Sequence, residues 1–542
     1  MSPHLRSRIA DGVVAALMVA VPLAASSAFA DQYTTVKWYL VHVLAAAWLL
    51  VEVWVCHSAG WPAFVRDRRF AVLAFAALAA WSALRGGPER ALAPLVDRGA
   101  CVVLALCSSW YFARNGGRTF AMAAGLSISA GTTVVVGLAQ AGGRSLPAAL
   151  TASEGPAALF GNVNMAAQFV GLALLLVLST PADRDGSRAV AWNAVRVALG
   201  VSGAVYLYLL SSRSVLLALA AAAVCVAWRS QKRFLEMAAG VSAVALLVLV
   251  WGQPWARLDP ALAERKASSI AARLSVWADT VSMIRDHPLG VGTASFEDAF
   301  LPYQARGRMQ PQESLVFRGP HNEYLRFLAE DGALFCAAAA VLAALLAARW
   351  RRSPARSPGL RTLVVAWGSF LAVESAFQFP LALAFGALAA SITVGATLAA
   401  VEAGSPARAS RLAWVAGGTL ASVMLLAVSL RVATSEYLYV KAPDDVRCQR
   451  RACALDPGNR PACVTAAWLE VREGDAPGAK ARLAAVLAGA PHYPPALKLL
   501  GEIAAMEGDP AEACRRLRAY DALFRGRSSV HASANLACAE AR

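Results

Sequence analysis

Three cationic or titratable side chains have the right chemistry to act on a phosphorylated substrate. They are Arg213, which stands between two serines, Arg273, four residues before Trp277, and His321, directly after a proline. A guanidinium group binds phosphate oxygens through paired hydrogen bonds, and the ordinary pKa of histidine suits a general base near neutral pH. Each residue alone also has a simpler interpretation: Arg213 as an arginine at the membrane interface, Arg273 as an arginine on a solvated helix face, and His321, or the next residue Asn322, as a helix cap.

The elements that must position these residues are predominantly membrane helices. The chain of 542 residues is 58% apolar and only 16% charged, whereas a water-soluble protein has about a quarter of its residues charged. Apolar stretches near 20 residues recur to about residue 432, each long enough to cross a hydrocarbon core of roughly 30 Å. The sequence therefore predicts an all-α, polytopic membrane helix bundle. The net charge of +16 lies in short clusters between these stretches, which indicates helix orientation and argues against nucleic acid as a partner.

Thirteen spans are predicted, or twelve if the weak boundary at Gln378–Pro380 joins two of them. They are 10–30, 38–55, 70–86, 97–113, 119–140, 165–180, 190–210, 214–228, 234–251, 323–348, 361–379, 381–401 and 412–432. Most lysines and arginines between spans fall on one side if the N-terminus is cytoplasmic, with 85–98 as the basic exception. The first span also resembles a cleavable signal peptide, but we expect it to be retained, and either outcome places residue 31 outside.

Two segments are too polar to lie in hydrocarbon. Residues 252–322, within a membrane domain of residues 1–435, carry many charges and are predicted to form a large periplasmic loop with a surface helix around Ile270–Ile284. Residues 436–542 form the second domain, in which Pro457 and Pro491 and several other pairs stand 34 residues apart.

The period of 34 is that of tetratricopeptide repeats, so a small α-helical, tetratricopeptide-like domain is predicted, on the periplasmic side. Such repeats usually bind a protein partner, and a purely stabilising role is the alternative. We expect this tail to tune partner or acceptor choice rather than chemistry. Antiparallel packing would bring Cys453 to Cys463 and Cys514 to Cys538, pairs that suit an oxidising periplasm.

Several motifs in a fixed order resemble the bacterial O-antigen ligase and polymerase family over roughly residues 10–400. Asn162 and Asn164 resemble its Asn-x-Asn motif, with Val163 where proline is common, and the segment from Asp31 to Lys37 is a weaker likeness. The more specific strings are Ser212–Ser214, Ala272–Trp277, Met283–Gly292, Pro320–Leu325 and Glu330–Gly332.

The resemblance implies a membrane glycosyltransferase with a fold like that of glycosyltransferase class C, in the bacterial inner membrane. It would take a glycan from undecaprenyl diphosphate and transfer it to an acceptor on a glycolipid, glycan or protein. Arg213 and Arg273 would bind the diphosphate, and His321 would deprotonate the acceptor hydroxyl. The supporting residues would be Asn322, Glu323, Tyr324, Asn162 and Asn164. No cofactor is expected, and because no aspartate-rich motif accompanies these residues, we expect arginines rather than a metal to stabilise the leaving group.

Four functions remain open, ranked ligase, repeat-unit polymerase, lipid-linked glycan transporter and non-catalytic scaffold. The first two fit one site equally well. A transporter would place its charges near the bilayer midplane, whereas these lie at the predicted outer surface. A scaffold would not need the two arginines and the histidine.

Overall fold

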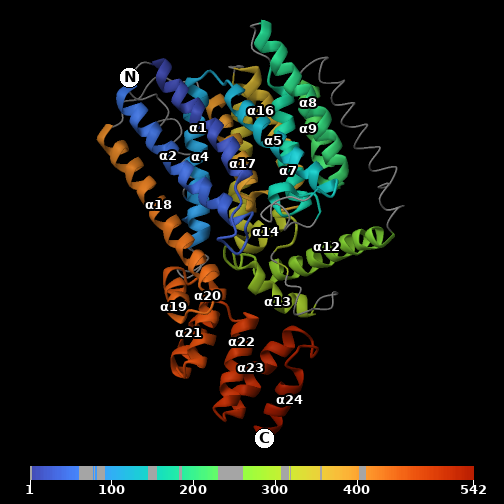
Figure 1. Cartoon of the computed structure of the whole chain (residues 1–542), viewed down its shortest axis with the longest axis vertical. Coiled ribbons are helices and arrows are strands. Elements are labelled where there is room, and N and C mark those ends of the chain that lie inside the picture. The colour runs from blue at the N-terminus through green and yellow to red at the C-terminus, as the bar shows by residue number, and fades with distance from the viewer. Residues whose placement is uncertain are drawn as a thin grey trace. The chain divides into compact units, whose positions relative to one another are not determined.

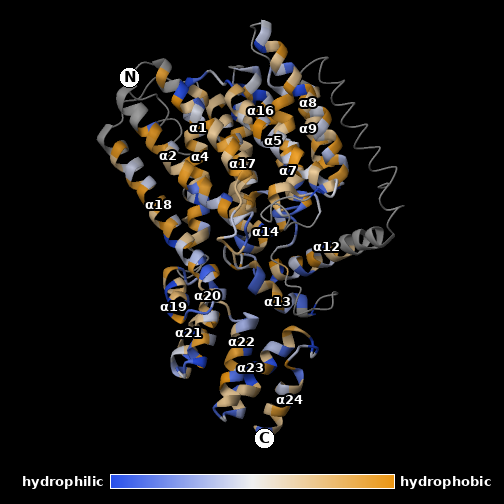
Figure 2. Ribbon diagram, viewed as in Figure 1, coloured by the Kyte–Doolittle hydropathy of each residue, from blue (hydrophilic) through white to orange (hydrophobic). Residues whose placement is uncertain are grey.

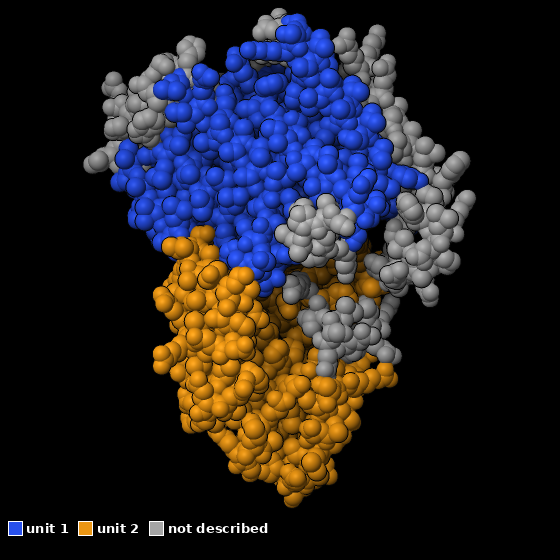
Figure 3. Space-filling model, viewed as in Figure 1, with its two compact units in different colours: residues 1–76, 97–263, 341–427 blue, residues 77–96, 264–340, 428–542 orange. Residues whose placement is uncertain are grey.

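The computed structural model describes a protein whose elements are helices (Figure 1). The described residues are 3–59, 77, 80–81, 92–144, 155–181, 186–229, 260–306, 317, 319–353, 357–401 and 411–542. They form two compact units (Figure 3), one of residues 1–76, 97–263 and 341–427, and the other of residues 77–96, 264–340 and 428–542. The predicted domain boundary at residue 435 lies inside a single helix, α18.

The first unit is a bundle of apolar helices. Within it α1 packs along α5, and α16 packs against α7, α9 and α17. Its elements are α1 (Pro3–Leu23), α2 (Thr35–Ala59), α5 (Phe120–Ala141), η1 (Ala158–Phe160), α7 (Val163–Ser179), α8 (Gly186–Leu210), α9 (Arg213–Arg229), α16 (Pro358–Ser375), η2 (Pro380–Ala382) and α17 (Ala384–Val401), with most of α4 (Leu92–Arg114) and of α18 (Arg411–Lys441) and part of α15 (Gly332–Arg352).

These helices are rich in apolar residues, as the orange ribbons of Figure 2 show, and many of those residues are exposed. On α8, for example, Val190, Val197 and Val201 are each more than 60% exposed. A surface of this kind is costly in water and favourable in lipid. Seven helices of the described part of the chain are long and apolar enough to cross a membrane, and α7 and α9 are shorter apolar helices. The protein is therefore a multi-pass membrane protein with an all-helical bundle, as predicted.

Three predicted spans differ from the structure or lie outside it. The predicted spans 70–86 and 234–251 fall almost entirely outside the described residues. The predicted span 323–348 is interrupted, because α14 ends at Glu330 and α15 begins at Gly332. The interruption coincides with Gly332, whose φ of +88° is a conformation that other residues rarely adopt.

The second unit combines the polar loop with the tail. It contains α12 (Pro260–Asp286), α13 (Phe296–Arg306) and α14 (Glu323–Glu330), followed by α19 (Val446–Leu455), α20 (Arg460–Arg472), α21 (Ala476–Gly489), α22 (Pro494–Met506), α23 (Pro510–Leu523) and α24 (His531–Glu540). A helix is thus present over the predicted segment Ile270–Ile284, as part of α12.

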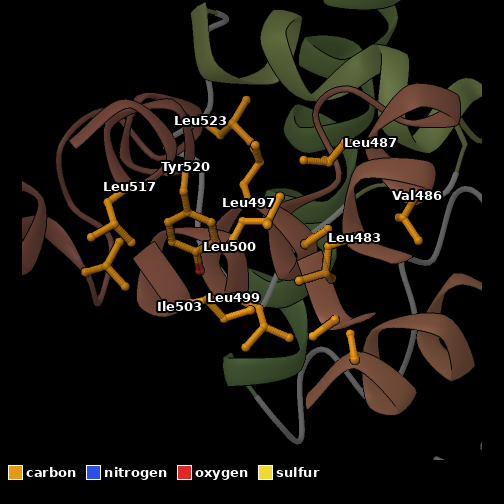
Figure 4. Close-up of a cluster of buried hydrophobic side chains, with 14 of the residues drawn as sticks. Leu483, Val486, Leu487, Leu497, Leu499, Leu500, Ile503, Leu517, Tyr520 and Leu523 are labelled. Atoms are coloured by element: carbon orange, nitrogen blue, oxygen red, sulfur yellow. The ribbon is translucent and has the colours of Figure 1, made fainter. Parts of the chain in front are cut away.

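The tail consists of antiparallel helix pairs with a regular offset. Helices α20 and α22 begin at Arg460 and Pro494, and α21 and α23 at Ala476 and Pro510, so both offsets are 34 residues. Asp475 and Asp509 cap α21 and α23 through their side chains. Leucines from α21, α22 and α23 interlock in the core (Figure 4). Disulfides join Cys453 to Cys463 and Cys514 to Cys538, the pairs that antiparallel packing predicts.

Candidate active site

A hydrogen bond joins the helix that carries Arg273 to the turn that carries His321. Arg273 lies on α12, half-buried, one helical turn before Trp277. The indole Nε1 of Trp277 donates to the carbonyl oxygen of Pro320 at 2.7 Å. Pro320 directly precedes His321, so this bond ties the helix of the arginine to the turn that carries the histidine.

His321 occupies an unusual backbone conformation. Its φ is +51°, in the left-handed region that costs a residue other than glycine on the order of 1 kcal/mol or more. The next residue, Asn322, is the N-cap of α14, and its side-chain oxygen accepts a hydrogen bond from the backbone N–H of Leu325 at 3.0 Å. The cap interpretation therefore holds for Asn322, while the imidazole of His321 is held at the start of the helix and is partly exposed.

Glu323 and Tyr324, the other predicted residues in the first turn of α14, differ in their exposure to solvent. Glu323 is almost fully buried and forms an ion pair with Arg326, one turn later, at 2.6 Å. Burial lowers the pKa of Arg326, but the neighbouring carboxylates Glu323 and Glu330 outweigh that effect and raise it. Tyr324 is half exposed, and partial burial raises its pKa, so the phenol stays protonated near neutral pH. Glu323 therefore supports the helix, whereas Tyr324 remains accessible.

The Pro-Leu-Gly and Glu-Asp-Gly strings of the sequence pack against each other. The backbone N–H groups of Val291 and Gly292 donate to the carbonyl oxygens of Ala329 and Glu330 at 2.8 and 2.9 Å. A Cβ atom added to Gly290 would lie 2.4 Å from the Glu330 oxygen, which explains why glycine is required there. These strings therefore build the frame of the site and hold α14 against the loop.

A further phenol near this frame is excluded as a base. The hydroxyl of Tyr303 donates to Asp286 at 2.8 Å. Burial, together with this hydrogen bond and the negative charge of Asp286, raises the pKa of Tyr303 to about 12. The phenol of Tyr303 therefore stays protonated at neutral pH.

Arg213, Asn162 and Asn164 belong to the first unit. Arg213 is the exposed first residue of α9. The hydroxyl of Ser212, its neighbour, donates to the Asn164 side-chain oxygen at 2.9 Å. Asn162 is the N-cap of α7, where its side chain accepts from the Asn164 N–H at 2.8 Å. The two asparagines therefore fix the start of α7 and, through Ser212, the turn that presents Arg213.

Glu374 is a residue of this cluster that sequence reasoning missed. It lies near the end of α16, fully buried, and accepts a hydrogen bond from the Ser214 hydroxyl at 3.1 Å. An acidic residue inside a predicted span is costly and therefore a functional candidate, so a search for charges within the spans could have found it. Arg326, which lies within the predicted span 323–348, carried the same signal.

Lys37, the last residue of the weaker Asp31–Lys37 likeness, is enclosed by contacts within the first unit. It is almost fully buried and donates to the carbonyl oxygens of Leu159, at 2.8 Å, and Ala24. The ammonium group also lies 4.9 Å from the ring centre of Phe160. Asp31 accepts from the backbone N–H groups of Tyr33 and Thr34 at the start of α2. These contacts fix the chain around η1, just before Asn162.

Among the residues that the structure describes, no cluster of three histidine, cysteine or acidic side chains could hold a metal ion.

Comparison with known proteins finds a matching family model but no matching curated protein. Residues 198–334 match a family model described as O-antigen ligase. This segment, about a quarter of the chain, contains Arg213, Arg273 and His321–Tyr324, so the part of the protein that carries the candidate site is similar to O-antigen ligases.

Proposed function

We propose that the protein is a membrane glycosyltransferase of the bacterial inner membrane, which transfers a glycan from undecaprenyl diphosphate to an acceptor hydroxyl on the periplasmic side. The similarity of residues 198–334 to O-antigen ligases supports this class of activity. The observation that carries the assignment of roles is the Trp277–Pro320 hydrogen bond, which brings the helix of Arg273 to the turn of His321.

In this reaction the acceptor oxygen attacks the anomeric carbon of the donor sugar. His321 takes the proton from the acceptor hydroxyl as the new carbon–oxygen bond forms and the bond to the diphosphate breaks. The undecaprenyl diphosphate leaves with an added negative charge, which Arg213 and Arg273 stabilise. Attack from the face opposite the leaving group inverts the anomeric configuration.

The other predicted residues support this chemistry through position. Asn162 and Asn164 fix the turn before Arg213, and Asn322 and Glu323 fix α14 behind His321. Tyr324, which is half exposed, is available to contact the acceptor. The tail is proposed to be a periplasmic, tetratricopeptide-like domain that binds a protein partner, a role that its 34-residue helix offset supports.

Deletion of the protein followed by analysis of periplasmic glycoconjugates tests this function. A ligase predicts loss of glycan from one acceptor and accumulation of full-length glycan on undecaprenyl diphosphate. A polymerase instead predicts accumulation of single repeat units on the same lipid. If lipid-linked glycan accumulates on the cytoplasmic side only, the protein is a transporter and the proposal is wrong.

A further inference from the structure

Helix α13 packs with the two helices that frame the candidate site, α12 and α14. Phe296 and Phe300 of α13 pack in one hydrophobic cluster with Val276 and Met283 of α12 and with Ala329 of α14. The backbone N–H of Phe296 also donates to the Glu330 carboxylate at 3.3 Å. Because α12 carries Arg273 and α14 follows His321, a displacement of α13 would be transmitted to both.

The repeat tail holds α13 from another side. Leu301 of α13 is 3% exposed and belongs to the hydrophobic core of the tail, together with residues such as Leu497 and Tyr520. Helix α13 also contacts α23. The tail is therefore packed onto the loop of the candidate site, and α13 belongs to two cores at once.

An ion pair fixes this junction. The guanidinium of Arg460, the first residue of α20, pairs with the carboxylate of Asp298, and the two side chains are only 16% and 5% exposed. The same guanidinium lies 5.5 Å from the ring centre of Tyr493. Removing one partner of such a buried pair leaves the other charge uncompensated, so the pair strongly favours one placement of α13.

We propose that Arg460 is a positioning residue for glycan transfer, which acts through Asp298 and α13 on the arrangement of Arg273 and His321. The inference rests on the proposed function and departs from the expectation that the tail affects only partner or acceptor choice, because it gives the tail an indirect, positioning role in the chemistry. A small displacement of catalytic groups can lower a rate by about 10²-fold, so loss of one anchor is expected to lower kcat by about tenfold.

The test compares Arg460→Met with Arg482→Met in the full-length protein. Arg482 pairs with the buried Glu470 inside the tail, with side chains 23% and 1% exposed, and therefore matches Arg460 in burial but not in location. Transfer from undecaprenyl diphosphate-linked glycan is measured at varied donor concentration and normalised to folded protein. We expect Arg460→Met to lower kcat about tenfold with the donor KM changed less than twofold. Arg460→Lys should recover part of the loss, and Arg482→Met should retain the parental kcat.

Hydrogen exchange of the amides of residues 321–330 provides a readout that does not depend on activity. We expect faster exchange there in Arg460→Met and parental exchange in Arg482→Met. Equal behaviour of the two variants in both measurements overturns the proposal. If Arg460→Met does not accumulate, Asp298→Asn is measured instead and judged by the same criteria. If neither variant accumulates in the membrane, the ion pair is needed for folding alone, and the proposal is overturned. If the parental protein transfers no glycan, the proposed function fails while the exchange experiment still decides the coupling.

Discussion

At the scale of single residues, Arg213 and Arg273 are proposed to bind the diphosphate through both their positive charge and the geometry of the guanidinium group. A lysine substitution of Arg273 distinguishes these two contributions. Lysine keeps the positive charge but loses the planar fork that binds two phosphate oxygens. We therefore expect Arg273→Lys to lower transfer at least tenfold, at unchanged abundance, with accumulation of the lipid-linked glycan. Arg285→Lys, an exposed position near the end of the same helix, is the control and should behave like the parent. Parental activity in Arg273→Lys would show that Arg273 contributes charge only.

His321 combines a titratable imidazole with a left-handed backbone conformation. Its substitutions must therefore separate the loss of the imidazole from a change in the backbone. His321→Ala is expected to lower the transfer rate by about 10²–10⁴, the usual contribution of a general base. The control is His321→Asn, because asparagine tolerates a positive φ but cannot act as the base. Both variants should be equally inactive. If Asn restores the rate, or if Ala transfers at the parental rate between pH 6 and 8, the backbone and not the base is what matters.

At the scale of elements, the helix pairs of the tail depend on a buried carboxylate. Glu470 accepts hydrogen bonds from Arg450 at 2.6 Å and from Arg482 at 2.7 Å. Burial alone would raise the pKa of Glu470, but the hydrogen bonds and charges of these two arginines outweigh burial and lower it below its ordinary value of 4.5. The ionised form is therefore favoured in the folded state.

The lowered pKa gives a definite pH dependence. The stabilisation by Glu470 is complete above pH 4.5 and is lost as the pH falls through the lower pKa of the folded state. We expect Glu470→Gln to destabilise the protein at pH 7 by about 2 kcal/mol, since both arginines are partly exposed, and to reduce the fall of the unfolding temperature between pH 5 and pH 3. Thermal unfolding in detergent measures both effects. Glu507→Gln, which breaks the exposed pair with Lys480, should change neither.

The helix boundaries show which structural features could be predicted from local sequence signals. The offset of 34 residues and the Gly-Asp strings predicted the helix pairs of the tail, because turns and caps are determined by neighbouring residues. The interruption after Glu330 was not predicted, because the hydropathy of 323–348 does not report that Gly332 must approach Leu289 closely. Likewise, Asn322 was recognised as a candidate cap, but the burial of Glu323 against Arg326 was not.

At the scale of the whole molecule, the orientation of the chain in the membrane can be tested directly. The distribution of lysine and arginine predicts that the 252–322 segment and the tail lie on the periplasmic side. Alkaline phosphatase fused after residue 442, where α18 has ended, should therefore be active, and so should a fusion near residue 300. A fluorescent protein that folds only in the cytoplasm should be dark at both positions. An inactive phosphatase at 442 with an active one near 300 would contradict an odd number of spans before the tail.

The sequence by itself determined that the protein is a helical membrane protein and that its tail repeats every 34 residues, and it supplied the predicted residues of the candidate site. Hydropathy, caps and motif order are properties of short segments, so they can be read without the fold. Only the tertiary structure decided that Trp277 binds the Pro320 carbonyl, that Glu374 accepts from Ser214, and that Arg460 of the tail pairs with Asp298. These contacts join residues 43 to 162 positions apart, and their partners are chosen by how helices pack rather than by any local pattern.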